Sequence, residues 1–217
     1  MHEGEPEILC ISESQKIKSD DQFVIFRGIY PAGIDEKVKD QIQRIVKKIV
    51  SSFRLRSCPM LVQMLYSHGE IYVVEFSART GGGLKFQMIK QVSGVDIIDE
   101  TIRATLGKSR CVKKQECAKY VVNEFLYCED GIFSHVEGFQ ELMDEKIICN
   151  FFVFKPSGTL MSGINSSGDR IASITLQADS YIESNSKYEL AMERIKVISD
   201  DGRDILRHDL KHPISSR

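Results

Sequence analysis

The stretch Ile71-Tyr-Val-Val-Glu75-Phe-Ser77-Ala-Arg79-Thr-Gly81-Gly-Gly83 decides how the rest of the chain is interpreted. Its apolar start, 71–74, predicts a buried strand, and Glu75, Ser77 and Arg79 follow at alternate positions. Side chains two residues apart share one face of a strand, so an extended backbone would bring a carboxylate, a hydroxyl and a guanidinium together. The glycines that follow permit a tight turn whose backbone N–H groups can meet an anion.

A second apolar run lies upstream and is joined to the first by a polar turn. Residues 60–66 are strand-like, and the sequence Ser-His-Gly-Glu at 67–70 connects them to Ile71. A short polar connection with glycine between two such runs is typical of a β-hairpin. We therefore expect a hairpin here, with His68 exposed at its turn.

Helices are predicted on both sides of this hairpin. From Asp35 to Phe53, apolar residues recur at steps of three and four with lysines between them, which indicates an amphipathic helix capped by Asp35. Two further helices are expected at 84–91 and 96–106, and the second has an apolar stripe. They are separated at Ser93-Gly94.

The remainder is rich in strand patterns, so the expected fold class is α+β. Residues 27–33 are expected to form a loop. We expect one lobe over 1–109 and a strand-rich subdomain over 110–217. Further strands are predicted at 8–12, 23–26, 120–127, 132–136, 147–154 and 170–176, and a last helix at 186–197.

Composition excludes several classes of protein. The chain has 217 residues, of which 42% are hydrophobic, enough for one large domain or two small ones. A net charge of -2 without a basic stripe argues against a nucleic-acid partner. No apolar run reaches about 18 residues and no leader pattern opens the chain, so we expect a cytoplasmic protein without a membrane span.

The cysteines do not indicate a metal site. The sequence contains six, without a C-x-x-C pair or a histidine spacing suited to zinc. We expect them to be reduced, partly buried thiols.

Residues 63–79 resemble the metal-binding hairpin of ATP-grasp enzymes, in which an acid or amide precedes a Glu-x-Asn-x-Arg motif. The distance from Gln63 to Glu75 is 75 − 63 = 12 positions, which agrees with that family. The strand before Gln63 is similar to that of carbamoyl-phosphate synthetase large chains, which use a glutamine there. Residues 80–107 and, more weakly, 166–170 resemble ligases of the L-amino-acid ligase type.

The resemblance implies a fold and a set of site residues. The fold would be the C-terminal lobe of an ATP-grasp enzyme, followed by a strand-rich subdomain. Gln63, Glu75 and Ser77 would bind magnesium or manganese, and Glu75 and Arg79 would be catalytic. Arg79 would also bind ATP phosphate, and a substrate carboxylate or phosphate would lie on the amides of Gly81, Gly82 and Gly83. Ser77 departs from the family, which has asparagine there, so a second magnesium would need a water or would bind loosely.

The implied function is an ATP-dependent carboxylate–amine or carboxylate–ammonia ligase that forms an acyl phosphate, similar to carbamoyl-phosphate synthetase. Its partners would be small carboxylate and amine substrates, and a homodimer is allowed. The N-terminal ATP-binding lobe of the family precedes the matched region, so we expect it in a longer form of this protein or in another chain. This chain alone would be inactive.

Other interpretations stay open at several positions. The chain could instead be a non-catalytic subunit or binding module whose metal set has decayed. An isolated Glu-x-Ser-x-Arg after a strand is commonly a solvated edge. Asp169 and Arg170 are expected to form a local ion pair or turn, and Arg27 and Lys85 are either phosphate ligands or surface charges.

Overall fold

The computed structural model describes residues 1–17, 23–115, 117–210 and 214, and its contacts divide the chain into two compact units. Unit 1 contains 1–11 and 32–117, and unit 2 contains 12–31 and 118–217. The division expected from the sequence at residue 109 differs in one main respect. Segment 12–31 belongs to unit 2 because its strands pair there.

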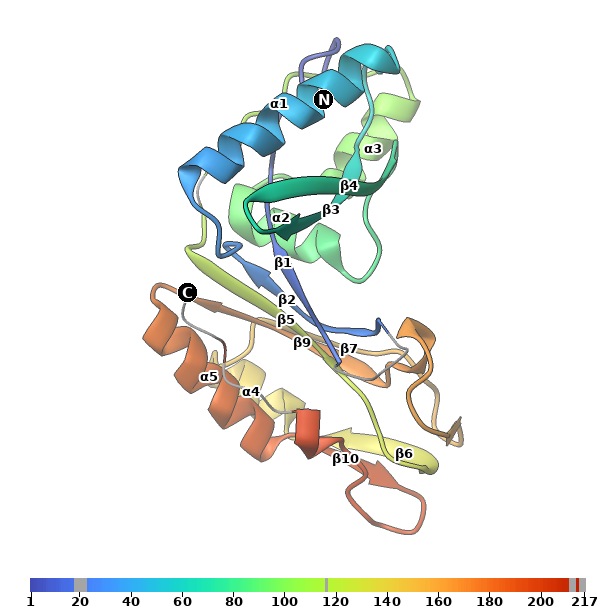
Figure 1. Ribbon diagram of the computed structural model, residues 1–217. Helices are drawn as coiled ribbons and strands as arrows, with labels where there is room; N and C mark the ends of the chain where they lie inside the picture. The colour runs from blue at the N-terminus through green and yellow to red at the C-terminus, as the bar shows by residue number, and fades with distance from the viewer. Residues whose placement is uncertain (18–22, 116, 211–213, 215–217) are drawn as a thin grey trace. The chain divides into compact units, whose positions relative to one another are not determined.

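Helices and strands are interspersed along the chain in a mixed α+β arrangement (Figure 1). The helices are α1 (Glu36–Ser52), α2 (Lys85–Ser93), α3 (Ile97–Thr105), α4 (Phe139–Asp144) and α5 (Tyr181–Arg194), with short 3-10 turns at Ser167–Asp169 and His208–Leu210. The strands are β1 (Glu13–Lys16), β2 (Ile25–Tyr30), β3 (Leu61–Ser67), β4 (Glu70–Ser77), β5 (Tyr120–Leu126), β6 (Gly131–Glu137), β7 (Asn150–Val153), β8 (Leu160–Met161), β9 (Ala172–Ala178) and β10 (Lys196–Ser199).

In unit 1, the helix predicted from residue 35 is confirmed as α1. The side chain of Asp35 accepts a hydrogen bond from Val38 N at 2.8 Å, which satisfies one of the free N–H groups of the first turn. One face of α1 is buried through Val38, Val46 and Val50. The apolar residues that recur with the helical period therefore form the packed face of the helix.

The predicted hairpin is confirmed as β3 and β4, which pair antiparallel. His68 and Gly69 connect them with φ angles of 51° and 84°. Positive φ at both central residues is the geometry of the tight two-residue turns that match strand twist. His68 is exposed, as expected.

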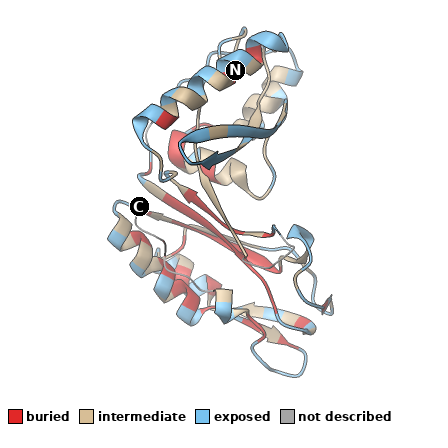
Figure 2. Cartoon of the chain, viewed as in Figure 1, coloured by how far each residue is buried: buried red, intermediate tan, exposed pale blue. Residues whose placement is uncertain are grey.

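Unit 2 is built on an antiparallel sheet with the order β1-β2-β5-β9-β7. Helix α5 lies along one face of this sheet (Figure 1) and contacts β9 and β5. A separate three-stranded sheet has the order β10-β6-β8. The main apolar core lies between α5 and the sheet, where Figure 2 shows much of the chain in the buried colour. Ile174, Leu176 and Tyr188 are fully buried there.

Several expectations about local structure were wrong. Residues 8–12 form no strand, and β1 begins at Glu13 instead. Residues 27–30, expected in a loop, belong to β2 because Arg27 to Tyr30 pair with β5. The apolar stripe of α3 is exposed at Ile98 and Ile102 rather than packed.

Two further findings concern the whole described chain. Its six cysteines are all free, with Cys111 and Cys117 exposed and Cys128 buried. None of the helices in the described residues is long and apolar enough to cross a membrane.

Candidate functional site

The hairpin places the predicted metal-binding side chains on one face. Gln63 lies directly opposite Glu75 in the β3–β4 register, and Ser77 lies opposite Leu61. Opposite residues in an antiparallel pair point to the same side with Cβ atoms about 4.5–5.5 Å apart. Ser77 shares that side because it is two residues from Glu75. An amide, a carboxylate and a hydroxyl therefore converge on one surface of unit 1.

A β-bulge sits immediately beside this set. The register changes between Gln63 and Met64, so that Met64 pairs with Val73 and Val74 has no direct partner. An extra residue of this kind bends a strand and redirects its side chains. It follows that Leu65 and Tyr72, which pair beyond the bulge, continue the face that carries Gln63 and Glu75.

The face is exposed, which corrects the expectation of a buried strand at 71–74. Tyr72 is 57% exposed and Val74 is 54% exposed, and Figure 2 shows the hairpin mostly in the exposed colour. The other face of the hairpin has a neighbour in unit 1, because the rings of Phe53 and Phe76 lie 4.7 Å apart. The sequence pattern revealed the strand but could not reveal how many of its faces are covered.

Arg79 does not continue the alternation that the sequence predicted. Strand β4 ends at Ser77, and Arg79 lies in the bend that follows. Its Nη1 atom donates to the Thr80 carbonyl at 2.8 Å. Within the described residues, neither Arg79 nor Glu75 forms an ion pair. Both charges are therefore available to a ligand.

The three glycines of the loop differ in their surroundings and backbone conformation. A Cβ on Gly81 would lie 3.3 Å from Lys85 Cγ, so the loop packs closely against the start of α2. Gly82 has open space around it. Gly83 has a φ of 61° and is followed by Leu84, which precedes α2 without a side-chain cap. Such a loop leading into a helix is a common way to present backbone N–H groups to an anion.

The ligand set fits magnesium only in part. No group of three or more His, Cys, Asp or Glu side chains suited to a metal occurs in the described residues. Glu75 would supply one carboxylate, and Gln63 and Ser77 would supply neutral oxygens. Magnesium is commonly held by one or two carboxylates together with substrate phosphates and waters. These residues therefore suit an ion whose shell is completed by a nucleotide.

Arg27 is neither a surface charge nor free to meet phosphate, which corrects both interpretations. It is fully buried in unit 2, and its Nε lies 2.5 Å from Glu124 Oε2. Its guanidinium also lies 4.2 Å from the centre of the Tyr188 ring. Burial raises the pKa of Glu124 to about 7, and the charge of Arg27 acts in the opposite direction. The partner is 97 residues away, so sequence reasoning had no local signal for it.

Asp169 and Arg170 have structural roles in unit 2, and the expected turn is confirmed. The Asp169 carboxylate accepts from Ser166 N at 2.7 Å and closes a capping box over a short 3-10 turn. Arg170 stacks on Phe125, with 3.7 Å between the guanidinium carbon and the ring centre, and donates to the Tyr127 hydroxyl at 3.1 Å.

No protein-family model and no curated protein sequence matches the chain. Among solved structures, phosphoribosylglycinamide synthetase from Anaerococcus prevotii is similar with a TM-score of 0.80 and 14% identity, over 92% of this chain and 51% of that one. L-amino acid ligase from Bacillus licheniformis is similar with a TM-score of 0.77 and 20% identity, over 92% and 50%. These neighbours are ATP-grasp enzymes. The chain has part of the ATP-grasp fold.

The similarity has a defined extent. The chain spans about half the length of these two structures. The expected α+β class and the resemblance to the fold of L-amino-acid ligases are confirmed, whereas the resemblance to carbamoyl-phosphate synthetase stays a prediction. Because the sequence identities are 14% and 20%, the comparison establishes the fold, and the roles of individual residues stay predictions.

Proposed function

We propose that this chain is the metal- and phosphate-binding half of a cytoplasmic ATP-dependent ligase. The ligase joins a small carboxylate to an amine or ammonia through an acyl phosphate, in the manner of carbamoyl-phosphate synthetase or an L-amino-acid ligase. The single observation that supports it most is the Gln63–Glu75 cross-strand pair, with Ser77 on the same face. This set lies on a chain that has part of the ATP-grasp fold.

Each residue of the face has a role in this proposal. Glu75 holds the metal through its carboxylate, Gln63 offers its amide oxygen, and Ser77 contributes its hydroxyl directly or through a water. When bound, magnesium or manganese neutralises charge on the ATP phosphates during phosphoryl transfer. The planar fork of Arg79 suits the oxygens of the transferring phosphoryl group. The amides of the Gly81–Gly83 loop hold a substrate carboxylate or phosphate.

Nucleotide use is supported by a further neighbour. The biotin carboxylase domain of 2-oxoglutarate carboxylase from Hydrogenobacter thermophilus is similar with a TM-score of 0.62 and 15% identity over 84% of this chain. That structure is described as a dimer with MgADP. By analogy, we propose ATP and magnesium as the ligands here, and a homodimer as one form of the intact enzyme.

Turnover requires a second half that binds the adenine. The first two neighbours are about twice as long as this chain. The resemblance to ATP-grasp enzymes implies a site formed by two lobes. That half is supplied by the same protein in a longer form or by a separate chain. In isolation, this chain binds nucleotide weakly and is inactive, so micromolar affinity for magnesium-ATP in a calorimetric titration would contradict this part of the proposal.

The alternative function is a non-catalytic ATP-grasp-like subunit or binding module. The observation that favours it is the ligand set itself, because Ser77 offers only a hydroxyl and Glu75 is its one carboxylate. If the site had decayed, Ser77→Asn would restore a stronger neutral ligand and create activity. If Ser77 is an adequate ligand, the same change has little effect on turnover.

The test measures ATP consumption by the intact two-lobed protein with amino acids as carboxylate and amine donors. We expect turnover that depends on magnesium and falls at least about a hundredfold in Glu75→Gln, because metal and phosphate charge are then poorly held. Glu70→Gln, an exposed carboxylate on the same strand, is the matched control and should retain activity. Full activity of Glu75→Gln would remove Glu75 from this role.

A further inference from the structure

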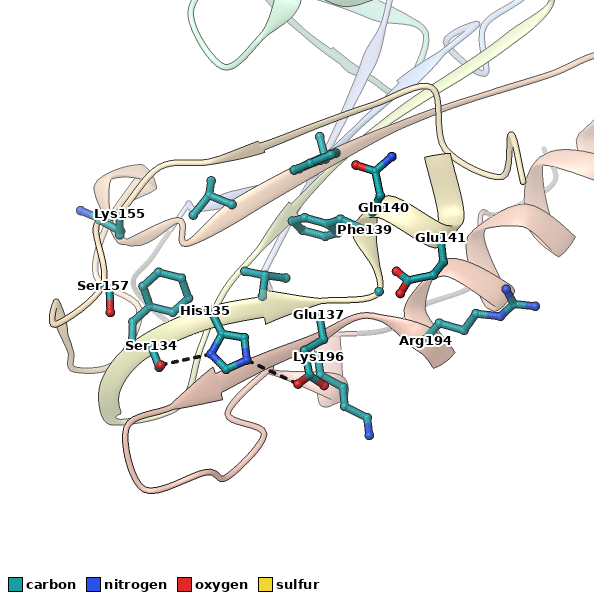
Figure 3. Close-up of a pocket in the computed structure, with 15 residues that line it drawn as sticks. Ser134, His135, Glu137, Phe139, Gln140, Glu141, Lys155, Ser157, Arg194 and Lys196 are labelled. Atoms are coloured by element: carbon teal, nitrogen blue, oxygen red, sulfur yellow. Dashed lines mark hydrogen bonds and ion pairs between the residues drawn. The ribbon is translucent and has the colours of Figure 1, made fainter. Parts of the chain in front are cut away.

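A groove of about 860 Å³ lies within unit 2, lined by parts of β6, α4, β7 and β10 (Figure 3). None of the hairpin or glycine-loop residues discussed above lines it. Its walls are parts of two different sheets. Strand β7 is the edge strand of the five-stranded sheet, and β6 is the middle strand of the three-stranded one, in which β8 pairs only with Gly131 and Ile132. The backbone groups along these edges define what the groove can bind.

The edge of β7 presents unpaired backbone groups to the groove. The backbone N–H of Phe154 donates to the Ile171 carbonyl at 2.8 Å, so the backbone polar groups of Phe154 point toward β9. Backbone direction alternates along an antiparallel strand, and the N–H and C=O groups of Phe151 and Val153 therefore point away from β9. These groups have no partner in the described residues, and both residues line the groove.

The opposite wall adds one more open position on β6. Val197, which pairs with Val136, uses its own N–H and C=O elsewhere, with Asp204 Oδ1 at 3.1 Å and Ile205 N at 2.8 Å. A pair of this kind is not hydrogen-bonded, so the backbone of Val136 also points away from β10. At the end of the groove, the backbone of Phe133 is already occupied by Gly158 and Thr159. The open part of the β6 edge therefore begins beyond that turn.

The side chains give the groove an apolar floor and a cationic end. The rings of Phe139 and Phe151 lie 4.7 Å apart on the floor. Lys155 and Lys196 form no ion pair within the described residues. Figure 3 shows Lys155 beside Ser157, at the end away from Glu141.

The other charges of the groove are partly compensated. Arg194 is held by Glu145 at 2.7 Å, and Glu137 lies 3.4 Å from His135. Glu141 is the one lining acid for which the described residues provide no ion pair. The charge of Lys155 helps to lower the pKa of the Asp169 carboxyl, but the two side chains form no ion pair within the described residues, so the Lys155 end still favours an acidic group.

We infer that this groove binds an extended peptide segment as an added strand on β7. The segment would place an apolar side chain on the Phe139–Phe151 pair and an acidic side chain at the Lys155 end. A row of outward N–H and C=O groups at the strand repeat suits a peptide backbone better than a compact metabolite, and this is the usual basis of strand addition. Exposed sheet edges readily accept another strand.

The test begins with selection from a phage-displayed library of random peptides about a dozen residues long, using the full chain as bait. We expect enriched sequences with alternating apolar residues and an acid, and Kd values of about 1–100 μM for the synthesised peptides. Amide hydrogen exchange reports the site. Binding should protect Val136, Phe151 and Val153, whereas Phe154 should be protected with or without peptide.

Two variants separate strand addition from other modes of binding. Val153→Pro removes an outward N–H that β9 does not use, and proline is tolerated at such edge positions. We expect it to weaken binding at least about tenfold, whereas Val153→Thr, which keeps the backbone donor, should bind normally. Lys155→Glu should weaken the binding of acidic peptides. This second variant keeps the test valid if Val153→Pro fails to fold.

Several results would overturn the inference. They are the absence of any enriched peptide, protection of amides outside the groove, and normal binding by both Val153→Pro and Lys155→Glu. Sedimentation gives one more such result. If the wild-type chain self-associates and Val153→Pro makes it monomeric, a second copy of the chain, and not a peptide partner, occupies the edge of β7.

Discussion

Arg27 and Glu124 illustrate how much a single residue depends on a distant partner. The two side chains form a buried ion pair in unit 2, with Nε and Oε2 2.5 Å apart and Tyr188 against the guanidinium. Burying either charge alone is costly, because the interior replaces little of the solvation that water provides. The pair therefore constrains this part of the sheet.

Replacing Arg27 alone should destabilise the protein strongly. We expect Arg27→Met to lower the free energy of unfolding by about 3–5 kcal/mol, since Glu124 is then left buried without its cation. The double variant Arg27→Met/Glu124→Leu should recover most of that loss, because no buried charge remains. Urea denaturation of the three proteins measures this, and equal stability of Arg27→Met and the wild type would contradict it.

At the residue scale, the sequence predicts which chemical groups share a face better than it predicts whether each side chain is buried or paired. Strand alternation, a local property, was sufficient to expect Glu75 and Ser77 on one face, whereas Gln63 joined them through the resemblance to ATP-grasp enzymes. Arg79 was misplaced because the strand ends at Ser77, and nothing in the sequence marks that end strongly. The environment of Arg27 is set by residue 124 and could not be predicted from its neighbours.

At the scale of elements, the β3–β4 hairpin depends on its turn. His68 and Gly69 both have positive φ, at 51° and 84°, and glycine adopts this region without the steric cost that a Cβ adds. The hairpin is also a small two-stranded sheet, which has little stability of its own. A defect in the turn should therefore act on this element first.

We expect Gly69→Ala to destabilise the hairpin by about 1 kcal/mol. Amide exchange in β3 and β4 should become faster, while exchange in β5 and β9 of unit 2 stays as in the wild type. Gly82→Ala is a suitable control because its Cβ meets open space. Faster exchange throughout both units would show instead that the hairpin is not an independent local element.

Elements with a strong local pattern were predicted well, and those defined by distant pairing were not. Helix α1 has both a cap and a regular apolar period, and its limits were close to those expected. The short strands β8 and β10 were missed because each exists through its pairing with β6. The sequence predicts a buried run at 71–74, but its exposure depends on what covers the hairpin, which no local pattern records.

At the scale of the molecule, the hairpin has the character of an interaction surface. Leu65, Tyr72 and Val74 are each more than half exposed on this hairpin, at 51%, 57% and 54%. Apolar side chains gathered on one exposed element commonly mark a surface that another part of an assembly covers. The second half of the two-lobed enzyme proposed above would provide that cover. The grouping of residues 12–31 with unit 2 was not predictable, because it follows from pairing of β2 with β5.

The central claim is that the Gln63–Glu75 face of this chain holds a divalent metal together with nucleotide phosphates. Water-proton relaxation of a Mn²⁺–ADP solution, measured as the chain is added, tests it most directly, because the relaxation changes when the complex is immobilised on protein. We predict a weak but measurable enhancement with the wild type and with Glu70→Gln, in keeping with the weak nucleotide binding expected of the isolated chain, and an affinity at least about tenfold lower with Glu75→Gln. The same enhancement with Glu75→Gln as with the wild type would contradict the account.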